Sequence, residues 1–376
     1  MAVDYLYIDT DEKLSAAVDA CLEVSVIALD TEFLRFNTYY PILGLIQIYT
    51  GKDCYLIDPL CISSIEPLKA VIEKQSIQKI LHACSEDLEV FQHALGAIPS
   101  PLYDTQIGGA ALGVGFSLSY QSLVEHHLKI SLKKDQTRSD WLARPLTKNQ
   151  LDYAALDVIH LLDLYHIQRE ELEGSPKLVW IQSESQGLGQ NIPTVAAPEE
   201  SYKRIKGLWQ LNRMQLNLLK NLCAWREVAA RKENFPRNRI VDQKSLVSIV
   251  KENITSAKDF QKIAGMTSRQ VRKYGDEIKA LQVEAGRVSE EDCPQLVDRT
   301  DAPINNKKLK RLKQVVESCA LTLSVAPELL SKRRHLEKLI RSEDELGRYH
   351  LPDELSGWRA NVIGEPLLTE LSDLSS

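Results

Sequence analysis

The stretch Ala28-Leu29-Asp30-Thr31-Glu32-Phe33 decides how the N-terminal half of this chain folds. Its two carboxylates lie two residues apart, at the polar end of an apolar run that begins at Val24. Residues i and i+2 of a strand share a face, so the side chains of Asp30 and Glu32 should point to the same place. The pattern predicts a strand that presents two converging acids at one end of a sheet.

Three further residues with reactive side chains lie downstream. Asp87 is predicted in the first turns of a helix that follows an apolar strand at 78–82. The segment 147–164 opens with the letters TKNQ, which have the form of a capping box, and it predicts a second helix. Tyr153 and Asp157 lie four residues apart on that helix and therefore share one face. The helix thus delivers a phenol and a carboxylate together.

We expect five residues to form one site: Asp30, Glu32, Asp87, Tyr153 and Asp157. Like charges about 4 Å apart repel by roughly 4 kcal/mol at an effective dielectric near 20, so either some carboxyl groups are protonated or cations lie among them. Carboxylate oxygens without His or Cys favour Mg²⁺ or Mn²⁺, and two such ions can drive phosphodiester cleavage. A phenol stays protonated at neutral pH, so Tyr153 is expected to orient the attacking water.

Each of these residues also has an ordinary explanation when it is taken alone. An acid at a strand end is often solvated, an acid on a helix is often a surface residue, and short motifs carry a high risk of false positives. Their joint occurrence, in this order along the chain, is what indicates a site.

Composition limits the class of protein. The chain has 376 residues, of which 44% are hydrophobic and 26% charged, which is typical of a globular protein with two or three domains. No apolar run is long enough to span a membrane and the N-terminus lacks an export signal, so we expect a cytoplasmic location. The seven cysteines form no C-x-x-C pair, which favours reduced thiols over disulfides or structural zinc.

Charge is distributed unevenly along the chain. The net charge is −14 over residues 1–200, +10 over 201–285 and −2 over 286–376. A basic segment joined to an acidic one is typical of a protein in which one part grips a polyanion while the other holds cations for chemistry. A solvated basic helical surface remains the alternative interpretation.

Pattern breaks divide the chain into five parts. Strand-like and helix-like segments alternate over 1–173, which predicts an α/β domain with a mixed sheet flanked by helices. Beyond it, apolar residues recur at helical spacing, which predicts all-α domains. The expected strands are Tyr5–Ile8, Ser25–Phe33, Gly44–Tyr49, Cys54–Ile57, Gln78–His82 and Leu102–Asp104. The expected parts after the first are a linker at 174–205, a helical domain at 206–285, a linker at 286–304 and a helical domain at 305–372.

Several motifs resemble one enzyme family. The acid-bearing segments are similar to the three motifs of the DEDDy branch of the DnaQ-like 3′–5′ exonucleases, and residues 1–170 resemble the ribonuclease D family. Further likeness comes from Thr38-Tyr39-Tyr40-Pro41, Gly44-Leu45-Ile46-Gln47, Ser139-Asp140-Trp141-Leu142-Ala143-Arg144-Pro145-Leu146 and Tyr153-Ala154-Ala155. Residues 206–285 resemble an HRDC domain, through 225–231 and 235–241, and 305–372 resemble a divergent second copy.

The resemblance implies a ribonuclease H-like exonuclease domain with two divalent cations, Mg²⁺ or Mn²⁺. It makes Asp30, Glu32, Asp87 and Asp157 the metal ligands and Tyr153 the residue that positions the water. It also implies a protein that trims structured RNA such as tRNA precursors from the 3′ end and releases nucleoside 5′-monophosphates. We expect this protein to be a monomer. Asn37 departs from the pattern, because relatives often carry an arginine there.

Substrate contacts and rival functions complete the expectations. Phe33 is predicted to stack on a terminal base, and four basic residues are predicted to contact phosphates, namely Lys133, Lys134, Arg138 and Arg144. One rival function is a 3′–5′ DNA exonuclease, since the sequence shows no evident reader of the 2′-hydroxyl. The other is a catalytically inert RNA-binding adaptor, which the intact acids disfavour.

Overall fold

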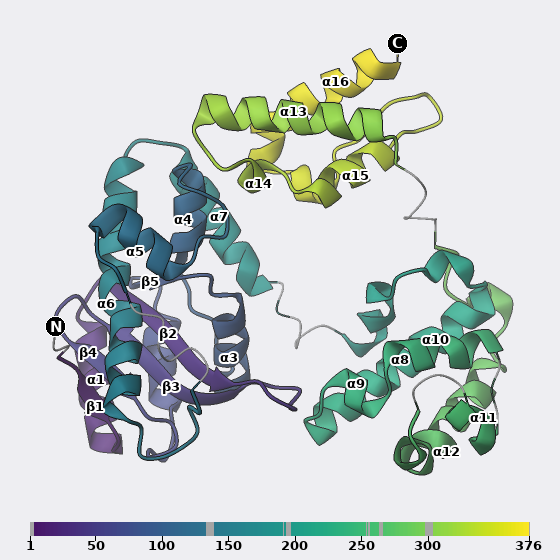
Figure 1. The fold of residues 1–376 in the computed structure, drawn as a ribbon, viewed down its shortest axis with the longest axis horizontal. Coiled ribbons are helices and arrows are strands. Elements are labelled where there is room, and N and C mark those ends of the chain that lie inside the picture. The colour runs from purple at the N-terminus through teal and green to yellow at the C-terminus, as the bar shows by residue number, and fades with distance from the viewer. Residues whose placement is uncertain are drawn as a thin grey trace. The chain divides into compact units, whose positions relative to one another are not determined.

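A computed structural model describes the residue ranges 4–132, 139–190, 192, 197–252, 254, 256–262, 266–297 and 304–375. The chain separates into two compact units (Figure 1). Unit 1 comprises Met1–Leu34, Ile42–Ile192 and Ile304–Ser376, and unit 2 comprises Arg35–Pro41 and Pro193–Pro303. Within the described residues, no helix is both long and apolar enough to cross a bilayer.

A mixed sheet of six strands forms the centre of unit 1, in the order β1-β4-β3-β2-β5-β6. Strands β2 and β3, and β3 and β4, pair antiparallel, whereas β1–β4, β2–β5 and β5–β6 are parallel. The predicted α/β class with a mixed sheet is confirmed, and the six strands lie close to their predicted places along the chain. The strands are β1 Leu6–Ile8, β2 Val26–Leu34, β3 Ile42–Tyr49, β4 Cys54–Ile57, β5 Gln78–Leu81 and β6 Leu102–Asp104.

Helices cover both faces of this sheet (Figure 1). Ile27 and Leu29 of β2 share one buried cluster with residues of α1, α2 and α3, whereas Ala28 shares the other with residues of α4, α5 and α6. This division follows from the alternation of side chains along a strand. These helices are α1 Asp11–Leu22, α2 Lys69–Ile72, α3 Ser85–Leu95, α4 Thr105–Ala111, α5 Tyr120–Leu128 and α6 Lys148–Glu171.

The predicted capping box opens α6. The Thr147 hydroxyl accepts a hydrogen bond from the backbone N–H of Gln150, and the Gln150 side chain accepts one from the backbone N–H of Thr147. Ala154 and Ala155 are fully buried against the sheet, because their small side chains let the helix approach closely. The helix runs to Glu171, seven residues beyond its predicted end at 164.

Part of the predicted linker at 174–205 is helical instead. Helix α7 spans Lys177–Gln190 and buries Trp180 and Ile181. The glycines at 187 and 189 suggested a break, but both lie inside this helix. Burial of the two large side chains outweighs the loss of roughly 1 kcal/mol that each helical glycine brings relative to alanine.

The C-terminal helical region packs on the rest of unit 1. The backbone N–H of Ala326 donates to the carbonyl of Ala110 at 2.8 Å. Trp358 stacks on Trp180 with ring centroids 4.6 Å apart, and Arg359 donates to both carboxylate oxygens of Glu184 at 2.6 and 2.7 Å. This region therefore shares a core with the sheet domain. Its helices are α13 Asn306–Leu323, α14 Pro327–Leu330, α15 Arg333–Arg341 and α16 Glu365–Ser375.

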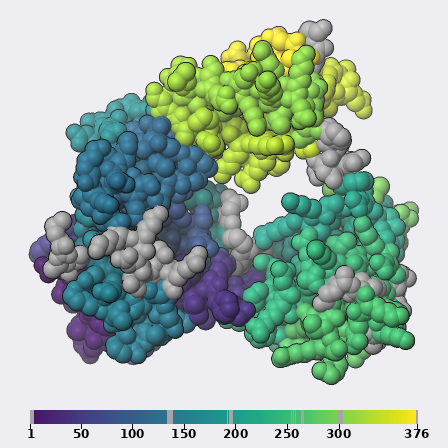
Figure 2. Space-filling model, viewed as in Figure 1, coloured from purple at the N-terminus to yellow at the C-terminus, as the bar shows by residue number. Residues whose placement is uncertain are grey.

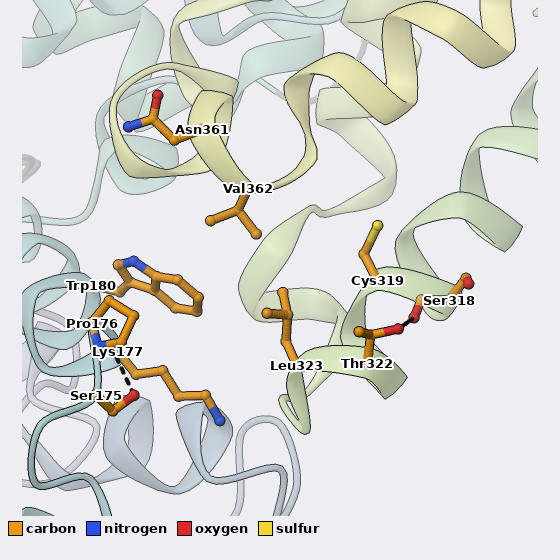
Figure 3. Close-up of a pocket in the computed structure, with 10 residues that line it drawn as sticks. All are labelled: Ser175, Pro176, Lys177, Trp180, Ser318, Cys319, Thr322, Leu323, Asn361 and Val362. Carbon is orange, nitrogen blue, oxygen red and sulfur yellow. Dashed lines mark hydrogen bonds between the residues drawn. The ribbon is translucent and has the colours of Figure 1, made fainter.

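A pocket of about 660 Å³ lies where α7 meets this region. Figure 3 shows Trp180 and Lys177 on one side and Leu323 and Cys319 of α13 on the other. The Lys177 ammonium donates to the carbonyl of Ser324 at 3.1 Å. The lysine thus ties the two surfaces together at the edge of the pocket.

The described residues of unit 2 form helices joined by turns and loops and contain no strand, as predicted for the chain beyond 206. Its helices surround buried Leu216, Leu219 and Ile249, and the same core includes Tyr39 from the segment Arg35–Pro41. In Figure 2 the green atoms of these helices pack into one body. The helices are α8 Arg213–Glu233, α9 Arg237–Ile240, α10 Gln243–Glu252, α11 Ala257–Lys262 and α12 Ser268–Ala285.

Candidate active site

Three of the predicted acids meet at one end of the sheet. Asp30, Glu32 and Asp157 each offer a carboxylate oxygen, and these oxygens all lie within 4.8 Å of one another. Asp30 and Glu32 come from the same face of β2, and Asp157 comes from α6. The i, i+2 spacing of the strand and the packing of α6 on that face therefore bring the carboxylates together.

Asp87 approaches from a different helix. It lies in the first turn of α3 and is 8% exposed. The hydroxyl of Thr31, the residue between the two strand acids, donates a hydrogen bond to its carboxylate. Asp87 is not one of the three residues whose oxygens lie within 4.8 Å of one another, although its charge raises the pKa of both Asp30 and Asp157.

Burial and mutual repulsion make ionisation of these acids unfavourable. Burial, reinforced by the charges of Asp157 and Asp87, raises the pKa of Glu32 to about 9. Burial likewise raises the pKa of Asp87 and of Asp157 to about 7, and it raises that of Asp30 well above its ordinary value. A divalent cation would offset this repulsion, and a set of carboxylate oxygens is the donor set that Mg²⁺ and Mn²⁺ prefer.

A buried glutamine next to the acids also indicates a site for divalent cations. Gln47 lies opposite Asp30 in the β2–β3 register, and directly paired residues point to the same face of a sheet. Gln47 is fully buried, yet neither its amide nitrogen nor its amide oxygen has a partner among the described residues. An unpaired buried amide costs about 1–3 kcal/mol. Ordered water around bound cations would supply the missing partners, so the residues present fit a metal site.

Tyr153 lies next to the acids. Its hydroxyl interacts with Asp157, four residues further along α6, and its ring centroid lies 6.2 Å from that of buried Trp141. Burial, together with the charges of Asp157 and Glu32, raises the pKa of the phenol above its ordinary value. The hydroxyl therefore stays protonated and acts as a hydrogen-bond donor.

The described part of the structure does not bring the residues predicted to contact the substrate together with the acids. Phe33 packs on the core cluster of the opposite sheet face, with α1, α2 and α3, and its stacking on a base stays a prediction. Arg144 donates to both carboxylate oxygens of buried Asp58 and to the carbonyl of Gly44. These bonds give Arg144 a structural role, and its contact with phosphate stays a prediction. Lys133, Lys134 and Arg138 lie outside the described residues.

Two features of the site were missed at the level of sequence. Gln47 was noted as part of a motif but was given no role, although a lone amide in the apolar strand Ile42–Tyr49 is a usable signal. The pairing of Arg144 with Asp58 joins residues 86 positions apart, and no local pattern indicates it.

Comparison with known proteins agrees with this geometry. Residues 5–173 match the family model for 3′–5′ exonuclease, residues 215–281 match the HRDC domain, and residues 303–367 match the C-terminal HRDC domain of ribonuclease D. The ribonuclease D of Pseudomonas paraeruginosa is 40% identical over 345 residues, which cover 92% of each chain. That of Escherichia coli is 37% identical over 97% of this chain and 98% of its own. The chain belongs to the ribonuclease D family.

A solved structure extends the match to three dimensions. The crystal structure of Escherichia coli RNase D superimposes with a TM-score of 0.90 and covers 98% of this chain and 99% of that one. As a member of the ribonuclease D family, the protein is a 3′–5′ exoribonuclease, and RNA is its substrate. The exonuclease fold is one that depends on divalent metal ions, in agreement with the acidic cluster.

Proposed function

We propose that this protein trims the 3′ ends of structured RNA, such as tRNA precursors, and releases nucleoside 5′-monophosphates by hydrolysis with two divalent cations, Mg²⁺ or Mn²⁺. We further propose that it does so as a monomer in the cytoplasm. The solved Escherichia coli relative is described as an exoribonuclease involved in structured RNA processing. The observation that carries the proposal is the convergence of Asp30, Glu32 and Asp157 within 4.8 Å.

The carboxylates of Asp30, Glu32, Asp87 and Asp157 are assigned to hold the cations. When bound, such cations supply an activated water and offset the negative charge on the leaving oxygen. The hydrogen bond from Thr31 to Asp87 keeps that carboxylate turned toward the end of β2. A neutral Thr31 donor can orient the carboxylate in this way without competing for the cation.

Tyr153 is assigned to position the attacking water. Its hydroxyl stays protonated because burial and the neighbouring acids raise its pKa, so it cannot remove a proton from the water. A fixed donor next to the acids can instead hold one lone pair of the water and direct the other toward phosphorus.

The helical unit is assigned to hold the body of the RNA. The segment 201–285 carries a net charge of +10, and such a charge supports sequence-independent contact with phosphates. Within unit 1, the 304–375 region is packed on the sheet domain through Arg359 and Trp358. Its proposed role is therefore to brace the nuclease domain.

The proposal is tested with a tRNA precursor labelled at its 5′ end. The expected result is a ladder of products that shorten from the 3′ end in Mn²⁺ or Mg²⁺ and that disappear in EDTA. Asp30→Asn should abolish the ladder, because the variant loses a charged ligand of the cations. Persistence of the ladder in EDTA, or wild-type activity in Asp30→Asn, would overturn the assignment. A DNA strand of the same sequence, run in parallel, tests the choice of polymer.

A further inference from the structure

The segment Arg35–Pro41, which follows Asp30 and Glu32 in the chain, packs within the basic helical unit. Tyr39 is 5% exposed, and its hydroxyl donates to Glu227 of α8. The side-chain oxygen of Asn234 accepts hydrogen bonds from the backbone N–H groups of Tyr39 and Tyr40, at 3.0 and 2.9 Å. These contacts fix the backbone of Arg35–Pro41 in unit 2.

A polar pocket opens beside this segment. Its volume is about 370 Å³, which falls within the usual range for small-ligand sites. Two arginines lie in its wall, and no acid is found among the described residues that line it. The lining residues are Arg35, Thr38, Tyr39, Pro236, Arg237 and Asn238.

Arginine side chains gather around this pocket. The carboxylate of Glu227 accepts hydrogen bonds from Arg231 at 3.1 Å and from Arg237 at 2.7 Å. Despite burial, the bonds from Arg237 and Tyr39 lower the pKa of Glu227 to about 2, so the carboxyl group is ionised beside these guanidinium groups. Arg35 and Arg237 both lie in the pocket wall. Guanidinium groups are suited to bind the oxygens of a phosphate.

An exposed aromatic residue stands next to the pocket. Phe36 is 71% exposed and directly follows Arg35. A single exposed apolar residue needs no explanation by itself. Here, however, it adjoins a basic pocket, and an aromatic ring beside basic groups is how single-stranded nucleic acid is held, with bases stacked on rings and phosphates against cations.

Covalent connection limits how far Arg35 can lie from the acids. Arg35 follows Glu32 by three residues, and three residues of fully extended chain reach about 10 Å at most. The backbone of Arg35 therefore stays within a few nucleotides' length of Glu32 whatever the placement of the rest of its unit.

We propose that this pocket binds a backbone phosphate of the single-stranded 3′ segment of the RNA, just upstream of the nucleotide that is removed, and that Phe36 stacks on an adjacent base. The proposal rests on the proposed function and assigns one of its RNA contacts. The residues that carry it are Phe36, Arg35 and Arg237.

The test measures binding of a short, unstructured RNA labelled with a fluorophore, by anisotropy, in an Asp30→Asn background that prevents cleavage. Phe36→Ala should weaken binding about 5- to 100-fold, the range expected for one lost stacking contact, and Phe36→Leu should not restore it. Arg35→Gln should lower the slope of log affinity against log salt by about 0.7, the value for one phosphate on a single strand.

Matched controls come from the same unit. Val283 is 58% exposed, and Lys279 lies on α12 outside the pocket. Val283→Ala should leave the affinity unchanged, and Lys279→Gln should leave the salt slope unchanged. Because Phe36 and Arg35 are both exposed, their variants should fold as the parent does, which circular dichroism checks.

The outcomes separate this inference from the proposed function. If the wild type trims RNA and the Asp30→Asn parent binds it, but Phe36→Ala and Arg35→Gln bind with the parent's affinity and salt slope, the pocket is not an RNA site. If the wild type neither trims nor binds RNA, the proposed function itself fails and this inference fails with it. Weaker binding in Phe36→Ala together with a lower slope in Arg35→Gln would support the proposal.

Discussion

The acid cluster should make the stability of the metal-free protein depend on pH, and Glu32→Gln isolates the effect. Glu32 has an ordinary pKa of 4.5, raised to about 9 in the folded chain by burial and by Asp157 and Asp87. At about pH 8 the unfolded chain therefore carries an ionised Glu32, whereas the folded chain holds it mostly protonated. Folding takes up a proton, which costs about 1.4 kcal/mol for each pH unit above the unfolded pKa, or roughly 5 kcal/mol at about pH 8.

The sign of the effect follows from this proton uptake. An acid whose folded pKa is raised binds more protons in the folded state, so stability is lost as pH rises from 4.5 toward about 9. Glu32→Gln is neutral in both states and avoids this loss. Without metal, the variant should be more stable than the wild type by up to about 5 kcal/mol at about pH 8, and the difference should vanish near the unfolded pKa.

Unfolding of the sheet can be followed through a buried thiol. Cys54 lies on β4 and is 3% exposed, so pulsed thiol labelling after equilibration in urea and EDTA, read on the peptide that carries Cys54, reports sheet unfolding apart from unit 2. Glu125→Gln, at an exposed position on α5, is the matched control for loss of a carboxyl group away from the cluster. Addition of Mn²⁺ should narrow the difference, because a wild-type site filled at about 100 times its Kd gains about 2.7 kcal/mol. A Glu32→Gln variant that is no more stable than the wild type at about pH 8 in EDTA would refute the reasoning.

Three further outcomes follow from the geometry. Tyr153→Phe should lower the cleavage rate about 10²-fold with unchanged Mn²⁺ affinity by calorimetry, and loss of Mn²⁺ binding would instead make the phenol part of the ion site. Gln47→Met should stabilise the protein in EDTA by about 1–3 kcal/mol and weaken Mn²⁺ binding about 10- to 100-fold. A variant with wild-type Mn²⁺ affinity would mean that the unpaired amide of Gln47 does not serve the metal site. Glu184→Ala should destabilise unit 1 by about 1–3 kcal/mol, because Arg359 loses a charged acceptor. An unchanged free energy of unfolding in urea would mean that the C-terminal region does not brace the sheet domain.

The elements that sequence predicted best are those set by local physics. The strand Val26–Leu34 and the start of the helix after Thr147 lie within one residue of their predicted positions. Together they place Asp30 and Asp157 on facing surfaces. These rules depend only on neighbouring residues, so a single sequence contains them.

What sequence could not predict depends on distant contacts. Helix α7 was predicted as a linker because its segment contains glycines and shows weak periodicity. The packing of Trp180 against the C-terminal region, which stabilises the helix, is a distant contact. The pairing of Arg144 with Asp58 could not be predicted because the two residues lie 86 positions apart. The assembly of Arg35–Pro41 into unit 2 was hidden for the same reason, since Tyr39 and Glu227 meet only in the folded chain.

The proposal that the carboxylates at the end of β2 hold the catalytic cations can be tested by anomalous diffraction from crystals grown with Mn²⁺. The predicted result is two anomalous peaks about 4 Å apart, from ions coordinated by oxygens of Asp30, Glu32, Asp87 and Asp157. Both peaks should be absent from crystals of Asp30→Asn. Crystals of active protein that show no peak at these residues, or peaks that persist unchanged in Asp30→Asn, would contradict the account.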